Sequence, residues 1–172
     1  RVFTEGLRRA FEWTRSPAYA NSIQLLANAS NGAIEDSSIR ETAYALRAYT
    51  DSHRLGQTVT APVNRTLMYL LGHFETLFCG PPEDCYPLIH QTFYDGLGAQ
   101  ALTYYYDYYE ADPRIPPTIK KMLDWLWEHA WDGVEGELVW NPYPTNASET
   151  RFCESGCETG NRDLMNLTIW AY

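Results

Sequence analysis

The four cysteines are the residues whose spacing bears most directly on chemistry. They form two close pairs, Cys79 with Cys85 in CGPPEDC and Cys153 with Cys157 in CESGC, and each pair encloses a short segment that contains a glycine. Two local disulfide bonds are the natural interpretation, and such bonds are typical of proteins from oxidising compartments. A zinc site with four thiolate ligands is the alternative, although such sites usually show C-x2-C pairs and these spacings are C-x5-C and C-x3-C. The close pairing also argues against a catalytic cysteine.

Four asparagines carry the N-x-[ST] acceptor pattern for N-glycosylation, namely Asn28, Asn64, Asn146 and Asn166. Half of the eight asparagines therefore lie in acceptor patterns, whereas chance would give about one at this serine and threonine content. This excess favours N-glycosylation of the chain. Together with the paired cysteines, it predicts an extracellular or cell-surface glycoprotein.

Charge and motif content exclude several classes of function. The formal net charge is -9, the isoelectric point is near 4.8 and no basic run exceeds two residues, so we expect no nucleic-acid partner. No apolar run approaches the roughly 20 residues of a membrane-spanning helix, so we expect no membrane insertion. The chain has no glycine motif for phosphate or dinucleotide binding and no G-x-S-x-G, and its four histidines never stand four residues apart. We therefore expect neither a metal nor a cofactor.

Apolar residues at helical spacing occur along most of the chain, so we expect helices to position any functional site. Apolar residues recur every three or four positions in 2–14, and the apolar segment 23–27 predicts a second, shorter helix. The segments 39–54, 94–109 and 161 onward are small, apolar or aromatic on almost every side, which is typical of buried helices. They alternate with amphipathic segments at 62–78 and 116–131. This alternation predicts one all-α domain over 1–172, built from helical hairpins in an inner and an outer layer.

The segment 116–131 carries three tryptophans, and helical periodicity predicts where two of them point. Its predicted apolar stripe includes Ile119, Met122, Leu126 and Trp127, so Trp127 should face the buried helix before it. Trp125 lies off this stripe, because residues two positions apart on a helix are separated by about 200°. We expect Trp125 to meet a neighbouring hairpin, a glycan or solvent. The following ELVWNPYP alternates and predicts a short extended piece.

Three motifs follow one another in the second half of the chain: the tyrosine-rich YDGLGAQALTYYYDYYEADPR, then IKKMLDWLW, then DLMN near the C-terminal end. Together they resemble the repeating unit of (α/α) toroids of the six-hairpin glycosidase type, as found in secreted bacterial proteins. The resemblance covers residues 38–172, and Met165 departs from it by standing before Asn166. It implies an (α/α) toroid or a partial toroid. A closed ring needs about six hairpins and some three are present, so we expect either a piece of a longer chain or an open half-ring.

The resemblance places the ligand cleft where loops enter the inner helices, which selects the loops 31–38, 81–96 and 132–163. Glycoside hydrolysis needs a general acid and a second carboxylate, whereas β-elimination needs a tyrosine or histidine base beside a cationic or amide group. The catalytic candidates in these loops are Asp95, Glu158, Asp163, Tyr94 and His90. Ordinary roles remain open, because both aspartates stand where helix N-caps stand, His90 can bond to a loop carbonyl and Glu158 can pair with Arg162.

Two aromatic residues outside regular helix, Trp140 and Tyr143, are the candidates for stacking on a sugar ring. Two functional hypotheses follow. The first is an extracellular carbohydrate-active or carbohydrate-binding toroid domain, of the glycoside hydrolase or polysaccharide lyase type, and the sequence leaves open whether it is an enzyme. The second is a non-catalytic surface or extracellular-matrix glycoprotein that serves as a scaffold.

Overall fold

A computed structural model describes residues 4–30, 39–59, 63–78, 92–129, 131–132 and 137–138. Six helices account for most of these residues, and two short strands follow them. The elements are α1 (Glu5–Thr14), α2 (Pro17–Ala29), α3 (Ile39–Arg54), α4 (Val63–Leu77), α5 (Thr92–Tyr108), α6 (Ile115–His129), β1 (Trp131–Asp132) and β2 (Glu137–Leu138). The fold class is therefore all-α, as predicted. None of the described helices is long and apolar enough to cross a membrane.

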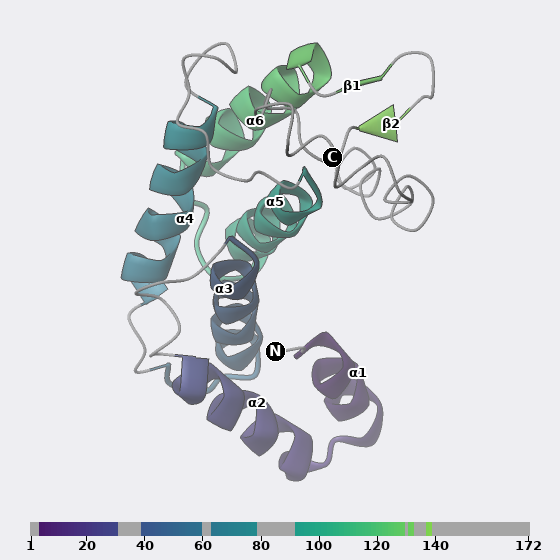
Figure 1. The fold of residues 1–172 in the computed structure, drawn as a ribbon. Coiled ribbons are helices and arrows are strands. Elements are labelled where there is room, and N and C mark those ends of the chain that lie inside the picture. The colour runs from purple at the N-terminus through teal and green to yellow at the C-terminus, as the bar shows by residue number, and fades with distance from the viewer. Residues whose placement is uncertain are drawn as a thin grey trace.

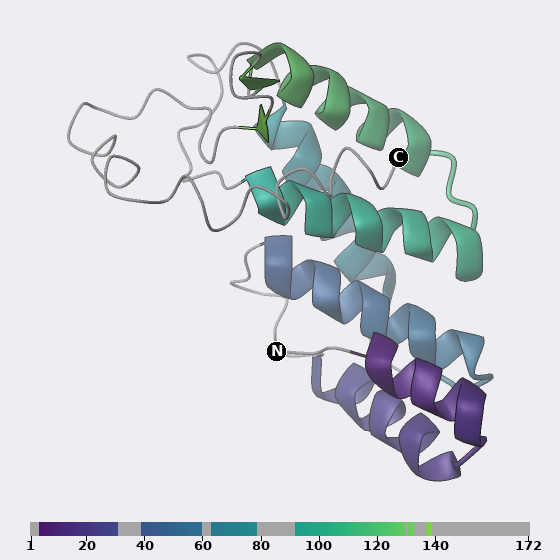
Figure 2. The same ribbon diagram turned by 90° about the vertical axis from the view of Figure 1, so that its right-hand side faces the viewer.

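The six helices form three antiparallel hairpins in two curved layers (Figure 1). Helices α1, α3 and α5 make the inner, concave layer, and α2, α4 and α6 make the outer layer. Figure 2 shows that the three inner helices run in the same direction, so their C-terminal ends lie together along one side of the arc. Within the inner layer, α3 and α5 pack along most of their length. The predicted alternation of inner and outer helices is therefore observed over α3 to α6, and the predicted buried helix from 161 onward lies outside the described residues.

Proline and glycine fix several helix boundaries. Pro17 opens α2 at its first turn, where a missing N–H costs nothing. The second helix is therefore longer than the predicted segment 23–27. After α3, Gly56 has a φ of +73°, the left-handed conformation that often ends a helix. Asp112 holds the turn before α6, because its Oδ1 accepts a hydrogen bond of 2.9 Å from the backbone N–H of Arg114.

The hydrophobic core lies between the inner and outer layers, and its largest completely buried side chains come from both. They are Tyr49, Tyr105, Phe74, Phe78, Ile23, Leu46, Leu70, Leu102, Ile115, Met122 and Leu126. The two layers are in close contact at Gly98 of α5, where an added Cβ would lie 2.5 Å from Cζ of Phe74 on α4. A glycine is therefore required at this crossing for steric reasons.

The prediction that Trp127 faces the buried helix before it is wrong, whereas Trp125 meets a neighbouring hairpin, which was one of the alternatives predicted for it. Trp125 is only 6 % exposed, and its ring lies 5.3 Å from the ring of Phe78, whereas Trp127 is 61 % exposed and stacks on Trp131 at 4.9 Å. The physical reason is that α6 packs on α4 as well as on α5. Its buried face therefore extends from Met122 toward Trp125 instead of toward Trp127.

The prediction that α5 is buried on nearly every side also needs correction. Tyr106 and Tyr108 are exposed, and Tyr104 is only partly buried. Tyr104 and Tyr108 lie on the inner side of the arc, where they line an open hollow in the surface of the described residues. The tyrosines thus supply both core packing, through Tyr105, and a polar, aromatic surface.

Candidate functional site

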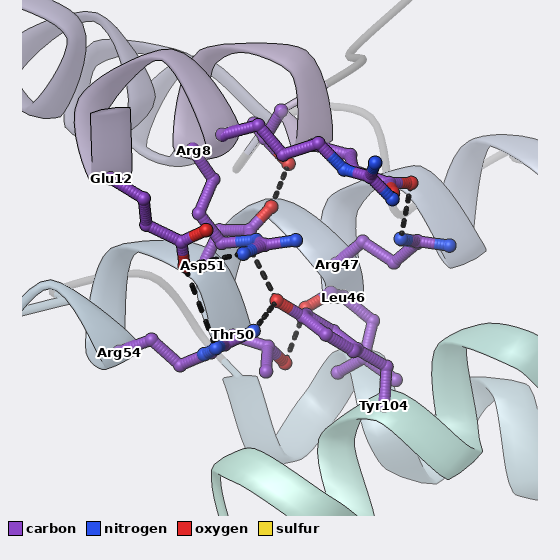
Figure 3. Close-up of polar contacts among 11 residues, drawn as sticks. Arg8, Glu12, Leu46, Arg47, Thr50, Asp51, Arg54 and Tyr104 are labelled. Atoms are coloured by element: carbon purple, nitrogen blue, oxygen red, sulfur yellow. Dashed lines mark hydrogen bonds and ion pairs between the residues drawn. The ribbon is translucent and has the colours of Figure 1, made fainter. Parts of the chain in front are cut away.

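A set of charged and tyrosine side chains lies among the three inner helices (Figure 3). On α3, Arg47, Asp51 and Arg54 stand four and three residues apart, so they share one face of that helix. Helix α5 contributes Tyr104 from its C-terminal half, and α1 contributes side chains from its facing side. Because the inner helices are parallel, residues far apart in the sequence meet at one level of the arc.

Asp51, which is completely buried, is the centre of this network. Its Oδ2 accepts a hydrogen bond of 2.6 Å from the hydroxyl of Thr4, and its Oδ1 accepts one of 2.6 Å from the hydroxyl of Tyr104. Oδ1 also lies 3.1 Å from Nε of Arg8 in an ion pair. A buried carboxylate is tolerated only with partners of this kind. Asp51 therefore ties both the start of α1 and the middle of α5 to α3.

Arg54 extends the network toward the surface. One of its guanidinium nitrogens donates a hydrogen bond to the hydroxyl of Tyr104, and the guanidinium carbon lies 3.9 Å from the centroid of the Tyr108 ring. The other terminal nitrogen lies 3.7 Å from a carboxylate oxygen of Glu12. A guanidinium stacked on an aromatic ring keeps its N–H groups in its own plane, where they can bind oxygen atoms.

Arg47 makes a second bridge between the inner helices. Its guanidinium donates to the amide oxygen of Gln100 on α5 at 2.6 Å and to a carboxylate oxygen of Glu5 on α1 at 3.1 Å. Glu5 also accepts a hydrogen bond of 2.6 Å from Arg9 one helical turn later. The guanidinium of Arg47 therefore joins all three inner helices through charge-assisted hydrogen bonds, which are stronger than hydrogen bonds between neutral groups.

Two titratable groups of the network have pKa values that favour binding over proton transfer. Burial, together with the hydrogen bond to Asp51 and the charge of that residue, raises the pKa of Tyr104 to about 12. Burial tends to raise the pKa of Glu5, but the hydrogen bond from Arg9 and the charge of Arg47 outweigh it, so the pKa of Glu5 is lowered. At neutral pH Tyr104 is a neutral hydroxyl and Glu5 a carboxylate, whereas a general acid needs a raised carboxyl pKa.

An open hollow of about 420 Å³ lies over this network. Its volume is within the range of roughly 300–1,000 Å³ that small-molecule sites occupy. The described residues that line it come only from the inner helices, and they are Glu5, Arg8, Arg47, Arg54, Gln100, Thr103, Tyr104, Asp107 and Tyr108. The lining thus combines tyrosine rings with many planar hydrogen-bonding groups, and we call it the tyrosine hollow.

Of the predicted catalytic residues, the structure describes Tyr94 and Asp95, both in the first turns of α5. Asp95 is completely buried, and the hydroxyl of Tyr94 accepts a hydrogen bond of 3.3 Å from Arg40. A carboxylate near a helix N-terminus is favoured by the helix dipole. Neither residue lines the tyrosine hollow, which lies toward the other end of α5. Their assignment as catalytic residues stays a prediction.

The other predicted site residues lie outside the described residues. They are the catalytic candidates His90, Glu158 and Asp163, the stacking candidates Trp140 and Tyr143, the cysteines Cys79, Cys85, Cys153 and Cys157, and the acceptor asparagines Asn146 and Asn166. The remaining acceptor asparagines, Asn28 on α2 and Asn64 on α4, are both exposed on outer helices.

Sequence reasoning missed the tyrosine hollow, although a signal was present. Arg47, Asp51 and Arg54 are charged residues at helical spacing on a helix of the buried type, and charged residues are rarely buried unless they are paired. Gln100, Tyr104 and Asp107 repeat a similar spacing on α5. Two polar stripes on neighbouring inner helices indicate that these helices share a polar surface.

The fold and the site define an all-α array of helical hairpins with a polar, aromatic hollow among its inner helices. Among the described residues, no group of three or more histidine, cysteine, aspartate or glutamate side chains could hold a metal ion. No protein-family model, curated protein or solved structure matches the chain.

Proposed function

We propose that this chain is a carbohydrate-binding domain of an extracellular protein, built as part of an (α/α) toroid. The observation that carries the proposal is the tyrosine hollow, in which aromatic rings stand beside arginine, glutamate, aspartate and glutamine side chains. Sugars present hydroxyl groups around an apolar ring, so they are bound by planar hydrogen-bonding groups together with aromatic surfaces. The resemblance instead predicts a ligand cleft where loops enter the inner helices, at the other end of α5, so the proposal rests on the hollow itself.

The chemistry of the hollow favours binding over catalysis. Tyr104 has a pKa raised to about 12 by burial and by Asp51, so it is a poor base at neutral pH. Asp51 is completely buried, accepts hydrogen bonds from Thr4 and Tyr104 and forms an ion pair with Arg8. Partial burial tends to raise the pKa of Glu5, but Arg9 and Arg47 outweigh it and lower that pKa. Acid and base catalysis would need the opposite changes in pKa. The extracellular location rests on the paired cysteines and the four acceptor asparagines.

The proposal predicts measurable binding of at least one polysaccharide to the whole chain. Binding to a panel of purified polysaccharides and their oligosaccharides is measured by isothermal titration calorimetry. The variants Gln100→Ala and Tyr108→Ala, both at exposed positions of the hollow, should each weaken binding by roughly threefold to tenfold, the value of one hydrogen bond or aromatic contact.

Tyr69→Ala is the matched control, because Tyr69 is an exposed tyrosine on the outer helix α4. It should leave the affinity unchanged. Circular dichroism of each variant checks that the helices are retained. If no polysaccharide binds, or if all three variants bind equally well, the tyrosine hollow is not a carbohydrate site.

A further inference from the structure

A second hollow of about 650 Å³ lies beside the first one. The described residues that line it belong to α1: Arg8, Arg9, Ala10, Glu12 and Trp13. Arg8 lines both hollows, so the two spaces adjoin at that side chain. Each volume alone is of the size that holds a small ligand. We call the two hollows together, from Tyr108 across Arg8 to Trp13, the extended groove.

Trp13 is an unusual residue at the end of this groove. It is 93 % exposed, the highest value among the large hydrophobic side chains of the described residues. An indole ring this exposed presents a flat aromatic face on which a sugar ring can stack. The ring of Tyr108, by contrast, is already covered by Arg54 at 3.9 Å. Trp13 therefore offers the groove its most open stacking surface.

The charges of the extended groove are balanced by pairing. Glu5 binds both Arg9 and Arg47, at 2.6 Å and 3.1 Å. Glu12 binds Arg8 and lies 3.7 Å from Arg54. Every arginine that lines either hollow thus has a carboxylate partner within the described part of the chain. An acidic ligand would have to break one of these pairs, and it would meet a chain whose net charge is -9.

We propose that the extended groove binds a neutral polysaccharide chain at two adjacent subsites, one in the tyrosine hollow and one on Trp13. This inference rests on the proposed function and specifies its ligand: uncharged, and long enough to span both hollows. Paired arginines and carboxylates can serve such a ligand without a change of charge, since each pair retains donors and acceptors for sugar hydroxyl groups. The indole ring of Trp13 supplies the stacking contact at the outer subsite.

The test measures affinity against ligand length and charge with the whole chain. The probes are neutral gluco-, manno- and xylo-oligosaccharides from disaccharide to hexasaccharide, and acidic oligogalacturonides of the same lengths. We expect the affinity for one neutral series to rise with length, because the second subsite adds contacts to a ligand that is already held. Trp13→Ala should lower the hexasaccharide affinity roughly tenfold and leave the disaccharide affinity unchanged. Tyr108→Ala should lower both.

Trp127→Ala is the matched control, because Trp127 is also an exposed tryptophan but lies on the outer helix α6. It should change neither affinity. A neutral ligand also predicts that added salt changes the affinity less than about twofold, since salt screens only charge interactions.

Several outcomes would overturn the two-subsite proposal while leaving carbohydrate binding intact. One is equal binding of disaccharide and hexasaccharide, with no effect of Trp13→Ala. Another is tighter binding of the acidic series with a strong dependence on salt. A third is a change of sedimentation coefficient in Trp13→Ala, which would place Trp13 in a contact between protein molecules. If no saccharide binds at all, the proposed function itself fails, and the two-subsite proposal fails with it.

Discussion

Asp51 and Tyr104 show how single residues determine the geometry of the inner layer. The two residues are 53 positions apart, and Thr4 is 47 positions from Asp51, yet both hydroxyls donate to the same buried carboxylate. Removing one partner of a buried charge leaves the other uncompensated, which is costly. The network therefore holds three inner helices in one register, and it places Arg54 and Tyr108 at the surface of the tyrosine hollow.

The burial of Tyr104, together with its hydrogen bond to Asp51, should make stability depend on pH in the alkaline range. The folded-state pKa of Tyr104 is raised from 10.0 to about 12 by burial and by Asp51, so folding favours the neutral phenol. This contribution is fully present below pH 10, the unfolded value, and is lost as the pH rises through about 12. Tyr104→Phe should lower the free energy of unfolding by about 1.5–3 kcal/mol at neutral pH.

Urea unfolding followed by circular dichroism at several pH values measures this effect. The difference between the unmodified chain and Tyr104→Phe should shrink as the pH rises from 10 to 12. Tyr106→Phe, at an exposed position on the same helix, is the control and should change stability little at any pH. A difference for Tyr104→Phe that stays constant up to pH 12 would mean that burial and Asp51 do not raise the pKa of its phenol.

Individual site residues were harder to predict from the sequence than the helices that carry them. The ion pairs that join different helices, namely Arg8 with Asp51, Arg47 with Glu5 and Arg54 with Glu12, connect residues far apart in the sequence. The sequence does not specify the rotation of each helix about its axis. The resemblance to (α/α) toroids predicted a ligand cleft at loops such as 81–96, whereas the tyrosine hollow is lined by residues of regular helices. The polar stripe at 47, 51 and 54 could have indicated it, because a helix with otherwise small and apolar residues needs a reason to carry three charges.

The helices themselves follow closely from local signals. Predicted segments at 39–54, 62–78, 94–109 and 116–131 correspond to α3, α4, α5 and α6 with small differences at the ends. Pro17 and Gly56 act as start and stop signals whose effect needs no tertiary information. The orientation of Trp125 and Trp127 was not predictable in this way. It depends on the two helices that α6 contacts, which periodicity in one segment does not specify.

Gly98 provides a test of how the layers pack. Glycine in a helix is usually less favourable than alanine by roughly 0.8–1.0 kcal/mol. At Gly98, however, an added Cβ would stand 2.5 Å from Phe74 and 2.9 Å from Ile39. The steric cost of such a clash is about 1–3 kcal/mol, so it should exceed the gain in helix propensity. Gly98→Ala is therefore expected to destabilise the protein, as measured by urea unfolding.

Gly72→Ala is the matched control for this substitution. Gly72 is exposed in the middle of α4, and no atom lies within 4 Å of an added Cβ. The same change of residue should here stabilise the protein by roughly 0.5–1 kcal/mol. Opposite signs for the two glycines would support the close approach of α5 to α4 and α3. A stabilising Gly98→Ala would show that the layers are farther apart at this crossing.

At the scale of the whole molecule, the two layers of the arc have different surfaces. The inner layer holds the paired charges and the tyrosine hollow, whereas the outer layer carries the exposed Asn28 and Asn64. Glycans are bulky and hydrophilic, so they are compatible with an exposed convex face and would obstruct a binding groove. The distribution of acceptor asparagines thus agrees with a ligand on the concave side and a solvated outer side.

This division predicts that glycosylation and ligand binding are independent of each other. When the chain is secreted from a glycosylating host, glycopeptide mass spectrometry should find glycans on Asn28 and Asn64, because both side chains are exposed in the folded protein. Asn28→Gln and Asn64→Gln should remove these glycans, and each should change the free energy of unfolding by less than about 0.5 kcal/mol, as expected for surface positions. Saccharide affinity should be the same for both variants and the unmodified chain.

Bare asparagines would remove the main support for an extracellular glycoprotein. An affinity that rises when Asn64 is replaced would place a glycan near the groove and contradict the separation of the two faces.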